Sequence, residues 1–167
     1  RYMMPDAAGY EAAGRRFEAY DRSLGEQGAA AFDVYSPLDC RVEDAMEQAD
    51  FLTLVYDDES AFRELLAIGQ EACRDEIRTA LAVGAEVIHC WWFYAGISGG
   101  WSPRIFEQYF LPMVKEQVDL AHQGGALYIY YDDGKLNQIL PFVLEAGADV
   151  VMTLTPAPVG DIDPIEV

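Results

Sequence analysis

Basic residues are scarce in this sequence, and so are long apolar runs. Its 167 residues include 11 Lys and Arg against 29 Asp and Glu, which gives a formal net charge of −18. Such a charge repels phosphate backbones and anionic lipid headgroups, so we expect neither nucleic acid nor a membrane surface as a partner. No apolar stretch approaches the ~20 residues that a membrane-spanning helix needs. No secretory signal is visible at the start either, and we expect a soluble, cytoplasmic protein.

Cysteines are few as well. Cys40, Cys73 and Cys90 are odd in number and lack Cys-x-x-Cys spacing, so neither a disulfide framework nor a zinc ribbon is expected. With 51% hydrophobic residues the chain can bury a sizeable core, and its length predicts one domain over residues 1–167. Because the chain begins at Arg1 and stops where a helix is about to begin, we expect an internal part of a longer protein, truncated at both ends.

What is present is a repeated unit, in which an apolar strand-like run is followed by an amphipathic helix that ends at Gly. Strand character covers residues 29–35, 86–93, 126–131 and 149–154, and helical spacing covers 9–25, 58–84, 102–123 and 136–147. Residues 41–49 favour a further short helix, and the state of 51–56 stays open. Ser102 and Pro103 favour a helix start, whereas Pro112 predicts a kink. The pattern predicts about four βα units with parallel strands.

Polar and aromatic residues follow the strands of this pattern. Trp91 and Trp92 end one run, residues 131–133 end the next, and residues 155–161 follow the last. In a parallel α/β architecture the carboxyl ends of the strands open onto one crevice. We therefore expect these side chains to share a ligand site.

Several short motifs are arranged in an order that resembles one known family. They are Gly99–Pro103, Tyr109–Pro112, Gly124–Gly125, Asp133–Gly134, Gly147–Asp149 and Gly160–Asp161. Their order and spacing resemble the uroporphyrinogen decarboxylase family, which also includes methyltransferases that work with corrinoid proteins. The resemblance covers roughly residues 28–167. It implies an α/β fold, the (β/α)8 TIM barrel, of which this chain would hold roughly half.

The resemblance also sets an expectation about metal. In the thiol-methylating members a His-x-Cys motif supplies zinc ligands, and the corresponding positions here are Tyr131 and Asp133. A phenol and a carboxylate do not make the thiolate-containing site that zinc prefers, so we expect no zinc. Asp133 and Tyr131 are instead the predicted catalytic residues, with Asp133 as a general acid/base or cation ligand. The alternative is that Asp133 belongs to an ordinary Asp-Gly turn.

Aromatic residues near the strand ends are the predicted substrate-binding groups. They are Trp92, Tyr94 and Tyr35, together with the acidic residue Asp161. Such a wall would stack on a flat or methoxylated aromatic substrate, or on a corrin face. The alternative is that the rings belong to the core, since strand alternation lets only about two of the four residues 91–94 face a crevice. His89 is predicted to be a hydrogen-bonded structural residue.

Three functions are consistent with these features. The first is transfer of a methyl group between a small molecule and a corrinoid (cobalamin) protein, with no covalently bound cofactor. The second is a uroporphyrinogen decarboxylase-type lyase of porphyrin biosynthesis, whose polycarboxylate substrate needs Arg or Lys; only Arg41 and Lys135 lie near predicted strand ends. The third is a non-catalytic binding or assembly module. A half barrel exposes two strand edges, so if these residues fold alone we expect an inactive homodimer paired through them.

Overall fold

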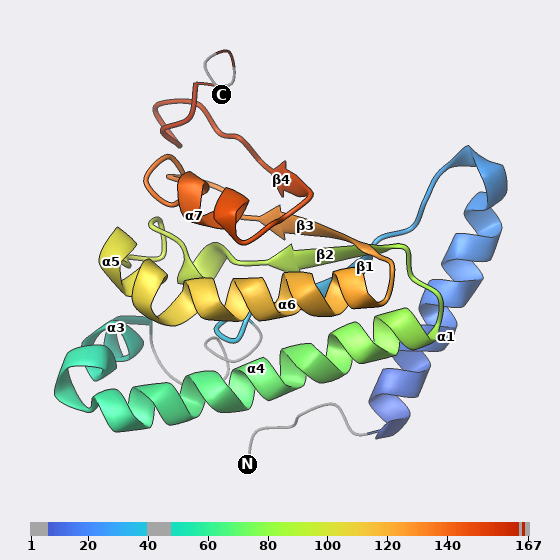
Figure 1. Ribbon diagram of the computed structural model, residues 1–167, viewed down its shortest axis with the longest axis horizontal. Coiled ribbons are helices and arrows are strands. Elements are labelled where there is room, and N and C mark those ends of the chain that lie inside the picture. Colours follow the sequence, from blue (N-terminus) through green and yellow to red (C-terminus); the bar gives the residue numbers. More distant parts are fainter. Residues whose placement is uncertain (1–6, 40–47, 164, 166–167) are drawn as a thin grey trace.

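The computed structural model describes residues 7–39, 48–163 and 165. Its centre is a sheet of four strands, β1 (Phe32–Tyr35), β2 (Val87–Trp91), β3 (Leu127–Tyr131) and β4 (Val150–Met152). The strands lie in the order β1-β2-β3-β4, and each neighbouring pair is parallel (Figure 1). Parallel neighbours require a crossover connection, and helices supply it here. The prediction of four parallel βα units is confirmed.

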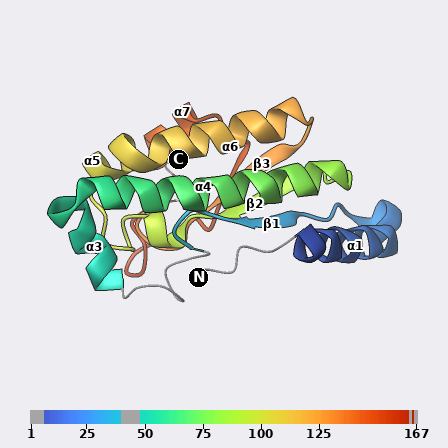
Figure 2. The same cartoon turned by 90° about the horizontal axis from the view of Figure 1, so that it is seen from below.

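Helices cover one face of this sheet. The long ones are α1 (Ala7–Leu24), α3 (Gln48–Asp57), α4 (Glu59–Ala82), α6 (Leu111–Gln123) and α7 (Leu140–Glu145). Short helical turns are η1 (Gly25–Gln27), η2 (Phe93–Ala95), α5 (Pro103–Ile105) and η3 (Phe106–Phe110). Helix α4 packs against β1 and α6 against β3, while α4 and α6 also contact each other, as the view from below shows (Figure 2). Helix α1 packs on α4.

Strand alternation decides which residues form the core. Alternate strand residues are fully or nearly buried beneath the helices, namely Phe32, Val34, Ile88, Cys90, Tyr128 and Tyr130. The residues between them lie on the opposite face of the sheet, as expected for a period of two. That face is much more open, since Tyr35 and Leu127 are 43% and 51% exposed.

Two helices begin at residues whose side-chain oxygens accept hydrogen bonds from the first backbone amides. The Asp58 carboxylate accepts a hydrogen bond from the Ala61 amide at 3.0 Å and so begins α4, while Ser102 Oγ accepts from the Ile105 amide at 3.3 Å. The kink predicted at Pro112 takes the form of a π turn just before it, over Phe106–Phe110. Proline cannot donate to the preceding turn, and the wider turn accommodates its ring.

Three segments refine the sequence prediction. Residues 51–56, whose state stayed open, belong to helix α3. The predicted helix at 136–147 begins only at Leu140. The residues before it form a turn in which the Ile139 and Leu140 amides donate to the Leu136 carbonyl oxygen. The helix predicted at 41–49, including Arg41, lies largely outside the described residues.

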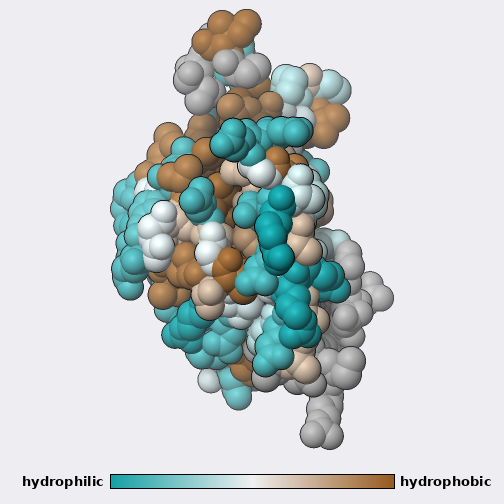
Figure 3. All heavy atoms as spheres, turned by 90° about the vertical axis from the view of Figure 1, so that its right-hand side faces the viewer, coloured by the Kyte–Doolittle hydropathy of each residue, from teal (hydrophilic) through white to brown (hydrophobic). Residues whose placement is uncertain are grey.

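The surface mixes hydrophilic and apolar patches. Seen from the side on which α1 lies, hydrophilic residues dominate below and apolar residues gather toward the top, where β4 and the end of the chain lie (Figure 3). Exposed apolar side chains on β4 and in the segment after it include Val150, Met152 and Val159. Among the described residues, no helix combines the length and the apolar character needed to cross a membrane.

Candidate functional site

Three aromatic side chains form a row across the carboxyl ends of three strands. Tyr35 on β1 is in register with Trp91 on β2, and Trp91 is in register with Tyr131 on β3. Because they share a register position, they also share the open face of the sheet. The ring centroids of Tyr35 and Trp91 are 6.2 Å apart, and those of Trp91 and Tyr131 are 4.5 Å apart.

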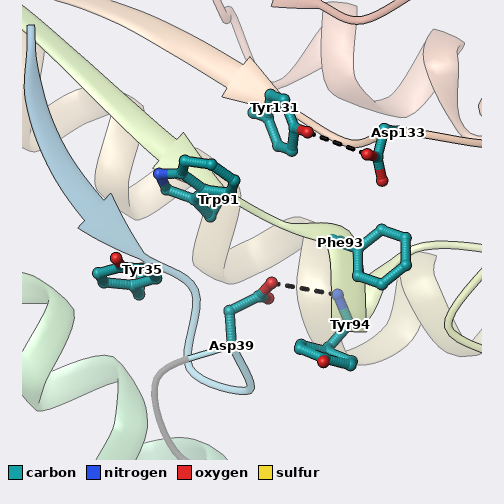
Figure 4. Close-up of a pocket in the computed structure, with 7 residues that line it drawn as sticks. All are labelled: Tyr35, Asp39, Trp91, Phe93, Tyr94, Tyr131 and Asp133. Atoms are coloured by element: carbon teal, nitrogen blue, oxygen red, sulfur yellow. Dashed lines mark hydrogen bonds between the residues drawn. The ribbon is translucent and has the colours of Figure 1, made fainter. Parts of the chain in front are cut away.

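A second wall rises beyond the strand ends. Phe93 and Tyr94 belong to η2, the turn that follows β2, and their ring centroids are 5.2 Å apart. Together with the aromatic row and the carboxylates of Asp39 and Asp133, they line a pocket of about 320 Å³ (Figure 4). This volume lies at the lower end of the range for small-molecule sites. The described lining thus contains five aromatic and two acidic side chains, and none that is basic.

Asp39 is held in a fixed orientation at the floor of this pocket. One carboxylate oxygen accepts a hydrogen bond from the Tyr94 amide at 3.2 Å, and the other accepts one from Ser36 Oγ. Burial raises the pKa of Asp39 to about 6, although these hydrogen bonds oppose the shift. The site therefore holds a carboxyl group that changes charge close to neutral pH.

Asp133 and Tyr131 form a pair at the upper side of the pocket. The Tyr131 hydroxyl donates a hydrogen bond to Asp133 Oδ2 at 3.0 Å (Figure 4). Burial, reinforced by this hydrogen bond, raises the pKa of the Tyr131 phenol above its ordinary value. The phenol is therefore a neutral donor at physiological pH, which leaves the exposed Asp133 carboxylate as the negative charge of the pair.

Asp132, which precedes this pair, is buried and has no hydrogen-bond partner for either carboxylate oxygen among the residues described. Burial, followed by the negative charges of Asp39, Asp133 and Asp161, raises its pKa to about 8. A buried carboxyl group in such surroundings carries a proton at neutral pH. The sequence pattern placed Asp132 at the strand end with Tyr131 and Asp133, but it did not reveal that this carboxyl group is buried.

The loops around the pocket approach one another closely at glycines, where a side chain would not fit. A Cβ built on Gly134 would stand 2.1 Å from Ser98 Oγ, and one built on Gly160 would stand 2.5 Å from the Gly134 carbonyl oxygen. Ser98 Oγ in turn accepts a hydrogen bond from the Lys135 amide at 2.9 Å. The loops that follow β2, β3 and β4 are therefore packed closely against one another, so they present the pocket residues on a compact frame.

Four of the six predicted site residues line this pocket, namely Tyr35, Tyr94, Tyr131 and Asp133. Asp161 lies elsewhere, in a separate pocket with Pro156 and Asp163. Its carboxylate caps the Leu136 and Asn137 amides at 2.8 and 2.9 Å, which is a structural contact.

The placement predicted for Trp92 is wrong. This side chain is fully buried on the helix-covered face, where its Nε1 donates to the Tyr128 hydroxyl at 2.9 Å. The Tyr128 hydroxyl in turn donates a hydrogen bond to Gln117 Oε1 at 2.7 Å. Adjacent strand residues point to opposite faces, so Trp91 occupies the pocket position instead.

His89 has the structural hydrogen bond that was predicted for it. Its Nδ1 lies 2.8 Å from Asp33 Oδ1, two register positions before the aromatic row. Trp91 Nε1 donates to the same carboxylate oxygen at 3.3 Å. Asp33 therefore holds the side chains of His89 and Trp91 in place through hydrogen bonds.

The described residues do not fit the zinc site known from thiol-methylating relatives. Tyr131 and Asp133 bind each other, and the two described cysteines are buried away from them. Cys90 Sγ points toward Gln117 at 3.2 Å, and Cys73 Sγ toward the Tyr35 carbonyl oxygen. Over residues 7–39 and 48–163, no group of three or more His, Cys, Asp or Glu side chains is arranged to hold a metal ion.

One solved structure shows the same fold, and a second resembles it more weakly. A methyltransferase from Methanosarcina mazei superimposes with a TM-score of 0.71 at 16% identity, covering 83% of this chain and 40% of that one. A xylose isomerase-like TIM barrel protein from Mycobacterium smegmatis, in complex with magnesium, gives a TM-score of 0.41 at 14% identity, over 82% of this chain and 44% of that one. The chain thus spans less than half of either protein. The first match identifies the fold as part of a (β/α)8 barrel, as predicted.

Sequence comparison identifies the family. No curated protein matches this sequence. The family model for uroporphyrinogen decarboxylase (URO-D), however, matches residues 43–158. That span includes β2, β3 and β4 and most of the pocket lining. The chain therefore belongs to the uroporphyrinogen decarboxylase family.

Proposed function

We propose that the protein transfers a methyl group between a small molecule and a corrinoid-bearing partner protein. The observation that carries this proposal is the pocket at the carboxyl ends of β1, β2 and β3, with its aromatic walls and two carboxylates. In barrel enzymes this end of the strands carries the reaction. The fold is shared with a methyltransferase, which supports the choice between the reactions known in the family.

The protein's own residues would bind and orient the methyl-bearing molecule. The row of Tyr35, Trp91 and Tyr131 offers a rigid apolar wall that excludes water from one side of the substrate. Orientation and water exclusion are the main demands of such a transfer, because they convert an encounter between two molecules into a reaction within one complex. The cobalt of the partner's corrinoid would supply the methyl carrier.

Asp133 and Tyr131 would fix the polar end of the substrate. The neutral Tyr131 hydroxyl donates to Asp133 Oδ2, which holds the carboxylate in the pocket lining. Asp133 would then act as a countercharge or hydrogen-bond acceptor.

The acidic lining of the pocket does not favour a porphyrinogen decarboxylase. A substrate with many carboxylates needs charge-assisted hydrogen bonds from Arg or Lys. The described pocket presents Asp39 and Asp133 instead, and no described lining residue is basic. Like charges at short distance repel, so a polyanion would be held weakly here.

The test is a corrinoid methylation assay on the full chain. Reduced cobalamin is mixed with the protein and with methyl donors of three classes, a methoxyarene, a methyl thioether and a methylated ammonium compound. Protein-dependent methylation of the cobalamin, seen in its absorption spectrum and lost in Asp133→Ala, is the expected result. No methylation with any donor, or decarboxylation of a porphyrinogen by the same protein, would overturn the proposal.

A further inference from the structure

The pocket has the composition of a site for an organic cation. Its walls are the rings of Tyr35, Trp91, Phe93, Tyr94 and Tyr131, and its only charged side chains among the described lining residues are carboxylates. Aromatic faces carry negative electrostatic potential and attract cations, most strongly those with weakly held hydration shells, such as quaternary ammonium groups. We infer that this pocket binds a methylated ammonium compound.

The geometry supports an enclosing arrangement rather than a single stacking surface. Trp91 lies between Tyr35 and Tyr131 in one row, and Phe93 and Tyr94 stand across from this row (Figure 4). The planes of Trp91 and Tyr131 are tilted by 48°, and those of Phe93 and Tyr94 by 69°. Rings set at such angles can line several sides of a compact group.

The two carboxylates supply countercharge from opposite sides. Asp39 comes from the loop after β1 and Asp133 from the loop after β3, and both carboxylates are directed toward the space between the rings (Figure 4). Asp39 is fixed there by the Tyr94 amide, and Asp133 by the Tyr131 hydroxyl. A cation between them would neutralise the negative charge that the carboxylates of Asp39 and Asp133 otherwise concentrate at this edge.

The same features select against other substrates. An anionic thiol or carboxylate would be repelled by the two acidic groups, and a neutral aromatic ring would gain stacking but would bring no charge to balance the carboxylates of Asp39 and Asp133. The inference deepens the proposed function, since a methylated ammonium would be the methyl donor or product at that site. Binding itself does not depend on the methyl-transfer proposal.

The experiment compares two ligands that differ only in charge. Choline and 3,3-dimethylbutan-1-ol have nearly the same shape, but the second replaces the quaternary nitrogen with carbon. Calorimetric titration of the protein is expected to show that choline binds about tenfold more tightly, which is the range of a cation–π and countercharge contribution. Equal affinities, or no binding of choline, would overturn the inference.

Variants locate the effect in the pocket. Trp91→Leu is expected to remove most of the preference for choline, and the exposed Asp133→Asn change to weaken choline severalfold while leaving the neutral analogue unaffected. Tyr56→Leu is the matched control, because Tyr56 is an aromatic residue on α3 that is 77% exposed and outside the pocket lining. A loss of choline binding in Tyr56→Leu equal to that in Trp91→Leu would contradict the assignment.

Failure of this inference and failure of the proposed function give different results. Methylation of cobalamin from a neutral donor, without choline binding, retains methyl transfer and rejects the cation site. Choline binding without any methylation retains the cation site and rejects methyl transfer.

Discussion

Gly96 lies directly against the carboxyl group of Asp132. A Cβ built on Gly96 would stand 2.2 Å from Asp132 Oδ2 and 2.8 Å from its Cγ. The backbone at Gly96 is extended, with φ of −83°, so the requirement for glycine here comes from space and not from a left-handed conformation. The turn after β2 is therefore fitted to the buried acid at the end of β3.

This contact predicts a specific pair of substitutions. Gly96→Ala is expected to lower the free energy of unfolding by about 1–3 kcal/mol, the usual cost of overpacking. In an Asp132→Ala background the same change should cost much less, because the group that it meets has been removed. Chemical denaturation of the four proteins of this cycle measures the coupling. Gly28→Ala is the control, since a Cβ there meets nothing within 4 Å, and additive costs at Gly96 and Asp132 would contradict the contact.

Asp132 also predicts how stability changes with pH. Its pKa is raised to about 8 from an unfolded value near ~3.9, so the folded state holds a proton that the unfolded state loses. The folded state is thus penalised progressively as pH rises from about 4 to about 8. Asp132→Asn cannot ionise, so its stability relative to the wild type should increase by a few kcal/mol over that range (on the order of 1.4 kcal/mol per pKa unit).

Thermal unfolding at about pH 5 and about pH 9 tests this sign. The difference in melting temperature between Asp132→Asn and the wild type should be larger at the higher pH. Asp119→Asn is the matched control, because Asp119 is an exposed carboxylate on α6. A difference that is the same at both pH values would show that Asp132 ionises normally in the folded protein.

Trp91 and Trp92 are expected to have opposite phenotypes. Trp92→Phe removes a buried donor from the Tyr128 hydroxyl and should lower stability by about 1–3 kcal/mol. Its effect on ligand binding should be small, since the side chain lies on the far face of the sheet. Trp91→Phe should change stability by less than about 1 kcal/mol, yet weaken the binding of choline. Denaturation and calorimetry on both variants would separate the roles, and a stability loss confined to Trp91→Phe would reverse the assignment.

The sequence predicted the order of the elements because local signals fixed them. Ser102 and Pro103 start a helix through a hydrogen bond and a missing amide, which depend on neighbouring residues alone. The apolar runs that became β2 and β3 were recognised by the same local pattern. The fold class followed from the alternation of these elements.

The face of the sheet on which each side chain lies was harder to predict. A shift of one residue in the register moves every side chain of a strand to the opposite face. The sequence has two adjacent tryptophans at the end of β2, and no local signal says which one faces the helices. The buried partner that decides the matter is Tyr128, 36 residues further along the chain. Asp161 lies outside the aromatic pocket for a similar reason, since the amides that it caps belong to a distant turn.

Asp39 predicts the pH dependence of ligand binding. Its pKa of about 6 means that it is mostly protonated at pH 5 and mostly ionised above pH 7. A cation in the pocket is attracted only by the ionised form, so the affinity for choline should rise severalfold between about pH 5 and about pH 7, and binding should release protons. The other acidic groups near Asp39 do not produce a step there, because Asp132 ionises only near pH 8 and burial raises the pKa of Tyr130 well above its ordinary value.

Asp39→Asn should abolish this rise while leaving the remaining affinity nearly constant across the range. Asp133→Asn provides the contrast, because it removes charge from the other side of the pocket and should lower the affinity at every pH while the step near pH 6 remains. Both variants keep the shape of the side chain that they replace, and circular dichroism confirms that the fold is retained. Titration of choline at several pH values decides the matter. A step that persists in Asp39→Asn would mean that another group titrates with the ligand, and Asp39 would then be a structural contact of Ser36 and the Tyr94 amide only.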